Sequence, residues 1–174
     1  MHNDQRPIIV RPFSAHDADA CFRMRREAFI RVFCQELGPK EVDAGANAYK
    51  AGEFAEMIGA MHSFVAMDGQ EPVGFCTVRL LDPATAEILF LYVGLDRVKQ
   101  GVGTRLLHHA ERWVAERYPD VFRVVLDTAV PLHNRRFYEK LGYSESAKSV
   151  CKYPNREVPA VRLSKSLIAN ITVD

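Results

Sequence analysis

A strand–helix–strand pattern in the second half of the sequence restricts the fold more than any other feature. Ile88–Val93 is a nearly continuous apolar run, which is typical of a strand covered on both faces. Gly101–Val114 then carries apolar residues three and four positions apart, as in an amphipathic helix. Val121–Thr128 is a second β-rich run. Because such a crossover is right-handed and joins parallel strands, the sequence predicts a parallel, adjacent pair inside the sheet.

Two β-rich runs before this unit extend the sheet. Ser63–Met67 and Pro72–Leu81 flank the turn dipeptide Asp68-Gly69, which predicts a hairpin. Ala86–Val93 follows a second turn, so the three runs predict an antiparallel meander. Shorter candidate strands are Ile8–Val10, Ser149–Tyr153 and Ala160–Ser164. We therefore expect an α/β fold with a mixed, mostly antiparallel sheet of six or seven strands, flanked by about four helices.

Helical periodicity marks two N-terminal segments. Apolar residues recur three and four positions apart from Cys21 to Phe33, which predicts one helix. A basic helix face is expected from Arg23, Arg25, Arg26 and Arg31. A second pattern runs from Glu41 to Met61, but three glycines interrupt it, each costing about 0.5–1 kcal/mol relative to alanine. We expect this helix to be weak or broken and favour packing as its support; the alternative is a mobile flap over a site.

Composition and charge exclude several classes of protein. The chain has 174 residues, 48% of them hydrophobic, as expected for a single domain spanning residues 1–174. Lys plus Arg (23) nearly balance Asp plus Glu (22), so no overall charge attracts nucleic acid. No apolar run suits a membrane helix, and no apolar signal core follows Met1–Pro7. The scattered cysteines indicate reduced thiols, no metal site and a cytoplasmic location.

A glycine-containing loop begins the helix of the strand–helix–strand unit. Val98–Thr104 reads Val-Lys-Gln-Gly-Val-Gly-Thr. Amide groups at a helix start lack intrahelical partners, the helix dipole is positive there, and glycines admit a phosphate close to the backbone. The loop therefore predicts a diphosphate site, with an ordinary turn as the alternative. It lacks the third glycine of a dinucleotide fingerprint and the Gly-Lys-Ser/Thr of a nucleoside triphosphate loop.

A second motif follows the next strand, in a short predicted helix over Leu132–Leu141 that Gly142 ends. Phe137–Tyr143 reads Phe-Tyr-Glu-Lys-Leu-Gly-Tyr. Together with the loop, this segment resembles the GNAT superfamily of acetyl-CoA-dependent N-acetyltransferases. Members carry an Arg/Gln-x-x-Gly-x-Gly/Ala loop and, one strand later, Phe-Tyr-Glu-Lys-Leu-Gly-Phe. Order and spacing agree over essentially the whole chain, so the resemblance implies a GNAT-like acyl-CoA N-acyltransferase fold.

The resemblance also implies how acetyl-CoA, the cosubstrate, is bound. The pantetheine arm is expected to lie beside the fourth strand of the family like an added strand, along Leu91, Tyr92 and Val93. The backbone of the loop and helix start is expected to hold the pyrophosphate. This set comprises Val98, Lys99, Gln100, Gly101, Val102, Gly103 and Thr104. In such a fold the two parallel strands splay apart, which leaves backbone groups for the pantetheine amides.

The resemblance also implies a general acid and a general base. Tyr138 corresponds to the family's general acid, and a phenol with a pKa of about 10 can protonate a departing thiolate. Glu87 is the candidate general base for the acceptor ammonium, because some relatives place a glutamate there; the alternative for Glu87 is a solvated carboxylate near the start of the strand. The alternatives are His62, Asp127 and His133.

Two positions depart from the family pattern. Val98 stands where the loop usually begins with Arg or Gln, so we expect one side-chain contact to be lost, with Arg97 or Lys99 as replacements. Pro131 occupies the position of a cofactor-contacting Asn, and Asn134, which follows in the next turn, is expected to take over that contact. A helix-capping role for Asn134 is the alternative.

The expected activity is acetyl transfer from acetyl-CoA to a primary amine of a small molecule, by direct attack in a ternary complex. The alternatives are a non-catalytic acyl-CoA binding module and a protein or peptide N-acetyltransferase. The resemblance implies an acceptor pocket formed by the segment from roughly Phe29 to Met61 and by the loop between the last strands. Relatives are often dimers, and we expect a homodimer contact through the C-terminal strands. Candidate lining residues are Phe33, Tyr49, Phe54 and Met57. Candidate acidic residues that attract a cationic amine are Glu36, Glu41, Asp43 and Glu53.

Overall fold

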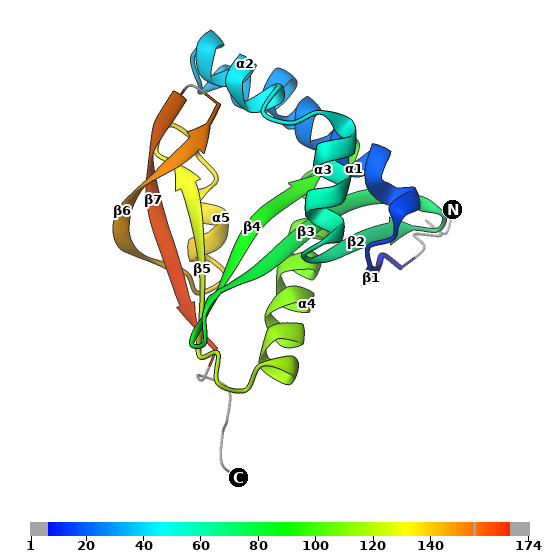
Figure 1. The fold of residues 1–174 in the computed structure, drawn as a ribbon, viewed down its shortest axis with the longest axis vertical. Coiled ribbons are helices and arrows are strands. Elements are labelled where there is room, and N and C mark those ends of the chain that lie inside the picture. Colours follow the sequence, from blue (N-terminus) through cyan, green and yellow to red (C-terminus); the bar gives the residue numbers. More distant parts are fainter. Residues whose placement is uncertain (1–6, 155, 168–174) are drawn as a thin grey trace, which may run out of the picture.

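A seven-stranded sheet in the order β1-β2-β3-β4-β5-β7-β6 organises the computed structural model, which describes residues 7–154 and 156–167 (Figure 1). The strands are β1 Ile9–Pro12, β2 His62–Asp68, β3 Glu71–Asp82, β4 Thr85–Val93, β5 Arg123–Ala129, β6 Ser144–Tyr153 and β7 Arg156–Ser166. Neighbouring strands are antiparallel except β4 and β5, which are parallel. The predicted α/β fold, meander and parallel pair are confirmed. Met1–Arg6, where the sequence predicts no signal segment, lie outside the described residues.

Helices cover both faces of the sheet. They are α1 Ala18–Glu27, α2 Pro39–Ala46, α3 Ala51–Gly59, α4 Val102–Arg117 and α5 Arg135–Glu139. The apolar stripe of α4 packs on one face with Phe64, Val78 and Leu126. On the opposite face α1 and α3 pack on β2, β3 and β4 around Phe54 and Phe75. None of the described helices is long and apolar enough to cross a membrane.

The first predicted helix changes its winding before it ends. The α-helical part stops at Glu27, Ala28–Val32 forms one wider π-helical turn, and Phe33–Gln35 forms a 3-10 turn. The rings of Phe29 and Phe33 lie on one side of these turns, with centroids 5.1 Å apart. Apolar periodicity identifies the inward-facing residues, but it does not resolve the number of residues per turn. π-Turns are frequent at functional sites, and both rings face the cavity described below.

The second predicted helix is broken, as expected. It is divided into α2 and α3, with Asn47–Lys50 between them. Gly45 is buried in α2, and a Cβ added there would overlap the ring of Phe29. Gly52 is exposed in α3, and a Cβ added there would meet nothing within 4 Å. Close packing against Phe29 therefore requires a glycine at position 45, whereas no packing contact requires a glycine at position 52.

The C-terminal strands are longer than predicted. β6 and β7 contain ten and eleven residues, whereas apolar runs predict about half of each. Most side chains of β6 are exposed, and polar residues therefore dominate a strand that backbone pairing with β7 holds in place. The short helix α5 is confirmed, with narrower bounds than the predicted Leu132–Leu141.

We expect Gly45→Ala and Gly52→Ala to change stability in opposite directions. Helix propensity alone favours alanine at both positions by up to about 1 kcal/mol. At Gly45 the collision with Phe29 exceeds this gain, because a packed core absorbs an added carbon poorly. Urea unfolding should show a lower midpoint for Gly45→Ala and an equal or higher midpoint for Gly52→Ala. Stabilisation by Gly45→Ala would contradict the close packing of α2 on Phe29.

Candidate functional site

The parallel strands β4 and β5 pair over a short segment and then diverge. Thr85–Glu87 is in register with Arg123–Val125. Beyond this segment, within the described residues, β5 provides no ladder partner for Ile88–Val93, whereas β3 pairs with the other edge of β4 as far as Val93. Figure 1 shows the two strands separating toward α2. The backbone groups on the open edge of β4 are therefore available to a ligand, as the family resemblance implies.

A cavity of about 510 Å³ occupies the wedge between these strands. Its narrow end, where β4 and β5 are still paired, is lined by the charged side chains of Arg79, Glu87, Asp127 and Arg162. Its wide end is mostly aromatic, with Phe29, Phe33, Tyr49, Phe90, Tyr92 and Tyr153. The cavity thus combines a polar, charged end with an apolar wall.

The four charged side chains form one network. The Nε of Arg79 donates a hydrogen bond to Glu87 Oε2 at 2.5 Å, and Arg162 Nη2 lies 3.5 Å from Glu87 Oε1. Arg162 also donates two hydrogen bonds to Asp127, at 2.9 and 2.8 Å. Hydrogen bonding to Asp127 is the main reason that the pKa of the Arg162 guanidinium is raised. Glu87 is 4% exposed. The network joins four strands and presents two carboxylates to the cavity.

Tyr138 reaches the same cavity from α5 on the other side of the sheet. It is 8% exposed and packs against the rings of Phe137 and Tyr143, with centroids 5.0 and 6.1 Å away. Burial raises the pKa of the Tyr138 phenol well above its ordinary value. The phenol therefore remains protonated at neutral pH and can act as a proton donor.

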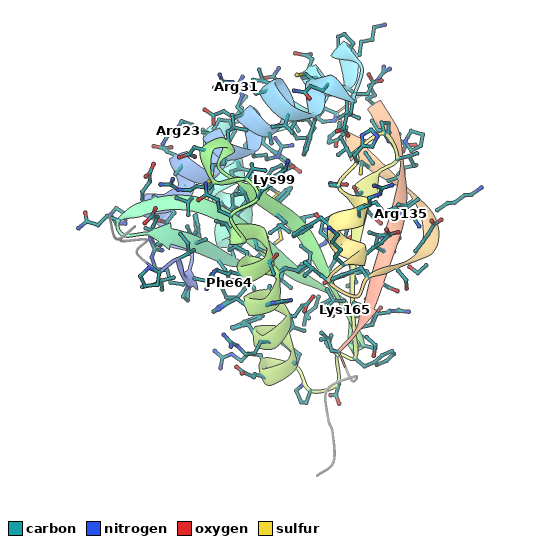
Figure 2. All side chains as sticks on the ribbon, turned by 180° about the vertical axis from the view of Figure 1, so that it is seen from behind. Arg23, Arg31, Phe64, Lys99, Arg135 and Lys165 are labelled. Carbon is teal, nitrogen blue, oxygen red and sulfur yellow. The ribbon has the colours of Figure 1, made fainter. Side chains whose placement is uncertain are left out.

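The predicted diphosphate loop forms the turn that leads into α4. Lys99 and Gly101 have positive φ values of 65° and 79°, and the helix begins at Val102. Arg105 N bonds to Gly101 O at 3.0 Å, so the amides before Arg105 precede the first intrahelical bond. Figure 2 shows Lys99 at this amino end of α4. The backbone amides at the start of α4 can thus donate hydrogen bonds to a bound anion.

The loop and the second motif lie close together. A Cβ added at Gly103 would lie 3.3 Å from the ring of Phe137, the neighbour of Tyr138. Leu91 and Tyr92 line the cavity, whereas Val93 packs against the α4 face of the sheet. Asn134 precedes α5 and accepts a hydrogen bond from Thr128 Oγ1 at 2.5 Å, so its side chain is fixed beside β5.

The alternative bases lie in different surroundings. Asp127 lines the cavity beside Glu87. His62 packs on Trp113, with ring centroids 4.4 Å apart, and its Nε2 lies 3.0 Å from the Tyr118 hydroxyl near the end of α4. The His133 side chain is 88% exposed and lies 3.3 Å from Glu36. Glu87 and Asp127 are therefore the two of the four candidates that face the cavity.

The lining residues expected for the acceptor are partly corrected. Phe33 and Tyr49 line the cavity, but Phe54 is fully buried between α3 and the sheet, and Met57 packs against that core. The four acidic candidates have partners outside the cavity. Glu36 bonds to His133, Glu41 to Arg156, Asp43 to Asn47, and Glu53 to the backbone of Lys50.

The prediction that Arg25 belongs to the basic helix face is wrong, and the sequence patterns do not identify Arg79 and Arg162 as lining residues. Arg25 does not belong to the basic helix face, because it is 2% exposed and lines the cavity. The signal was present, since Arg25 lies four residues after Cys21 and four before Phe29, and this spacing places all three on one helix face. Arg79 and Arg162 lie in strands, where isolated charged residues usually mark a solvated face.

Among the described residues, no group of three or more His, Cys, Asp or Glu side chains could hold a metal ion.

Comparisons with known proteins agree with this geometry. A family model described as the acetyltransferase (GNAT) family matches residues 20–143. A GCN5-related N-acetyltransferase from Rhodopseudomonas palustris superposes with a TM-score of 0.81 at 22% identity, over 95% of this chain and 99% of that chain. The PaiA N-acetyltransferase from Thermoplasma acidophilum, solved with coenzyme A, gives 0.76 at 16% identity, over 92% and 99%. No curated protein sequence matches the chain significantly.

A third solved structure, an aminoglycoside 6'-acetyltransferase type Ii, is 26% identical and superposes with a TM-score of 0.66, over 92% of this chain and 97% of that chain. Since the family model spans both motifs and the wedge between β4 and β5, the chain belongs to the acetyltransferase (GNAT) family, enzymes that use acetyl-CoA as cosubstrate.

Proposed function

We propose that the chain acetylates a primary amine of a small molecule by direct attack in a ternary complex. The observation that supports a small acceptor is a set of contacts between the N-terminal helices and the C-terminal strands. Glu41 forms an ion pair with Arg156, and the rings of Phe29 and Tyr153 lie 5.6 Å apart. An extended peptide would need an open groove along this line. The contacts close it and favour a small acceptor over a protein or peptide.

The residues of the wedge fit acetyl-CoA. The open edge of β4 along Leu91–Val93 offers backbone groups to the pantetheine amides, and the backbone of Val98–Thr104 offers amides to the pyrophosphate. Gly101 turns the chain into the helix with a positive φ, a backbone conformation that glycine adopts without the strain of a side chain. Asn134 remains a proposed cofactor contact from the side of β5. When bound, acetyl-CoA supplies an activated acetyl thioester.

Tyr138 is the proposed general acid. Its phenol lines the cavity from α5, while the diphosphate loop contacts its neighbour Phe137. A phenol is protonated at neutral pH and burial raises the pKa of Tyr138 further, so Tyr138 carries a proton that it can donate to the coenzyme A thiolate as that group departs. A general acid is needed by an enzyme but not by a non-catalytic acyl-CoA binding module, so the role of Tyr138 distinguishes the two alternatives.

Glu87 is the proposed general base, which accepts a proton from the acceptor ammonium directly or through water. It is buried in the charged end of the cavity and is oriented by Arg79 and Arg162. Cys151 also lines the cavity, but burial raises the pKa of its thiol to about 11, so it is a poor nucleophile at neutral pH. The surroundings of Cys151 therefore favour direct attack over a covalent acetyl-enzyme.

We further propose a single domain that works in the cytoplasm and forms a homodimer through its C-terminal strands. The four cysteines are free thiols, which suits a reducing compartment. β6 is an edge strand of ten residues with mostly exposed side chains, and Val150 on it is 41% exposed. Such an edge can pair with a second copy.

Tyr138→Phe should lower kcat about 100-fold or more, because the proton donor is lost while the ring still fills its place. Calorimetric affinity for coenzyme A should stay within about twofold of wild type. Tyr143→Phe is the matched control, since its hydroxyl donates to Glu111 at 2.8 Å inside the core. This control should lower stability rather than kcat. An unchanged kcat in Tyr138→Phe would support the non-catalytic alternative.

Glu87→Gln should lower kcat at least about tenfold at neutral pH, with partial recovery at higher pH as more of the acceptor amine becomes neutral. The glutamine keeps an acceptor oxygen for Arg79. Asp127→Asn changes the other carboxylate of the same network and should have the smaller effect on kcat. A larger loss in Asp127→Asn would assign the base to Asp127.

The pH profile of kcat should show no decline caused by deprotonation of Tyr138 below pH about 10. Tyr138 acts in its protonated form, and its pKa is raised, so activity is lost only as the pH rises through that raised value. Stopped-flow thiol release measured from pH 6 to 10 tests this. A decline below pH 9 that disappears in Tyr138→Phe would contradict it.

A further inference from the structure

Arg25 is a buried cation that lines the cavity and makes no ion pair with any described residue. It projects from α1, is 2% exposed and lines the wide, aromatic end. Its Nε and Nη1 are buried without a hydrogen-bond partner among the described residues. Leaving charged donors unpaired in a protein interior is costly, so the arrangement requires an explanation.

The other cations that line the cavity are paired. Arg79 bonds to Glu87, and Arg162 bonds to Asp127. Lys152 is 76% exposed at its side chain and lies 3.8 Å from Glu157. Within the described residues, no carboxylate lies within 4.0 Å of the Arg25 guanidinium. Among the described residues, Arg25 is therefore the cation lining the cavity whose charge has no anionic partner.

Three aromatic rings hold Arg25 in place. Its guanidinium carbon lies 5.1 Å from the ring centroid of Phe29, 4.9 Å from that of Tyr49 and 5.9 Å from that of Phe90. Cation–π contacts offset part of the charge and fix the side chain, but they do not use the in-plane N–H groups. The result is a fixed positive charge in an aromatic wall of the cavity, and such a charge complements an anionic group such as a carboxylate.

We propose, on the basis of the proposed acetyl transfer, that Arg25 binds a carboxylate of the acceptor, so that the acceptor is an amino carboxylate. Phe90, beneath Arg25, lies three residues along β4 from Glu87, about 10 Å at the rise of a strand. The amine therefore faces the carboxylate end of the cavity while the acid group faces Arg25. The surrounding rings favour an apolar body between the two groups.

The test compares acceptors that differ only in the acid group. Thiol release from acetyl-CoA is measured with α-amino and longer ω-amino carboxylates, each beside its carboxamide. A carboxamide lowers the pKa of a nearby ammonium relative to a carboxylate, so a larger fraction of the amine is neutral and able to attack. A higher kcat/KM for the carboxylate therefore cannot be explained by the protonation state of the amine. We expect kcat/KM at least about tenfold higher for the carboxylate member of the preferred pair. Equal values across all pairs would overturn the proposal.

Variants of Arg25 locate the effect. Arg25→Met keeps length without charge and should bring the carboxylate-to-carboxamide ratio toward 1, mainly through KM. Arg25→Lys keeps the charge but places it on a smaller head group and should give an intermediate ratio. Arg23→Met, on the exposed face of the same helix, should leave the ratio unchanged. If Arg25→Met keeps the wild-type carboxylate-to-carboxamide ratio, the assignment is overturned. If Arg25→Met does not fold, the wild-type ratio in Arg25→Lys would overturn it.

A second readout separates binding from structural support. Without ligand, Arg25→Met should melt at a temperature equal to or above that of the wild type, since an unpaired buried charge is removed. A lower melting temperature with an unchanged ratio would show a purely structural role and overturn the proposal. If the wild type releases no thiol with any amine, the proposed function fails. Calorimetric titration of the amino carboxylates into wild type and Arg25→Met then still tests Arg25.

Discussion

The end of the pairing between β4 and β5 after Glu87 is the constraint on which the rest of the site depends. A parallel ladder that continued to Val93 would use the backbone groups of β4 and leave no room between the half-sheets. The charged network of Arg79, Glu87, Arg162 and Asp127 sits where the pairing stops. It anchors four strands at one end of the wedge. The cavity, the open strand edge and the approach of α5 all follow from this short pairing.

The two faces of the sheet then contribute different chemistry. On one face, α4 and α5 bring an amide-rich helix start and a protonated phenol to the wedge. On the other face, α1 and its π-turn bring aromatic rings and a guanidinium. Since the wedge passes through the sheet, reagents held on opposite faces can meet inside it. The fold supplies this meeting point through its topology, and the side chains determine what meets there.

Sequence reasoning located the sheet, the parallel pair and both motifs, because period-two and helical patterns depend on local residues. It identified the broken helix from its glycines, although the reason for Gly45 is a contact with Phe29 from a different helix. It did not identify the cavity wall. Arg25 looked like part of a basic surface, whereas three rings from separate segments enclose it. Such enclosure depends on tertiary packing, which no local pattern reports. The roles of Tyr138 and Glu87 rest on resemblance and position.

The open edge of β4 has one more consequence. An unpaired strand edge is a template for any extended chain, and proteins ordinarily shield such edges against intermolecular β-pairing. Here the edge lies between two half-sheets, and the ion pair between Glu41 and Arg156 together with the contact between Phe29 and Tyr153 bridges the wide end. These bridges restrict what can enter the wedge. They therefore oppose self-association at the same edge that the proposed pantetheine contact requires to be free.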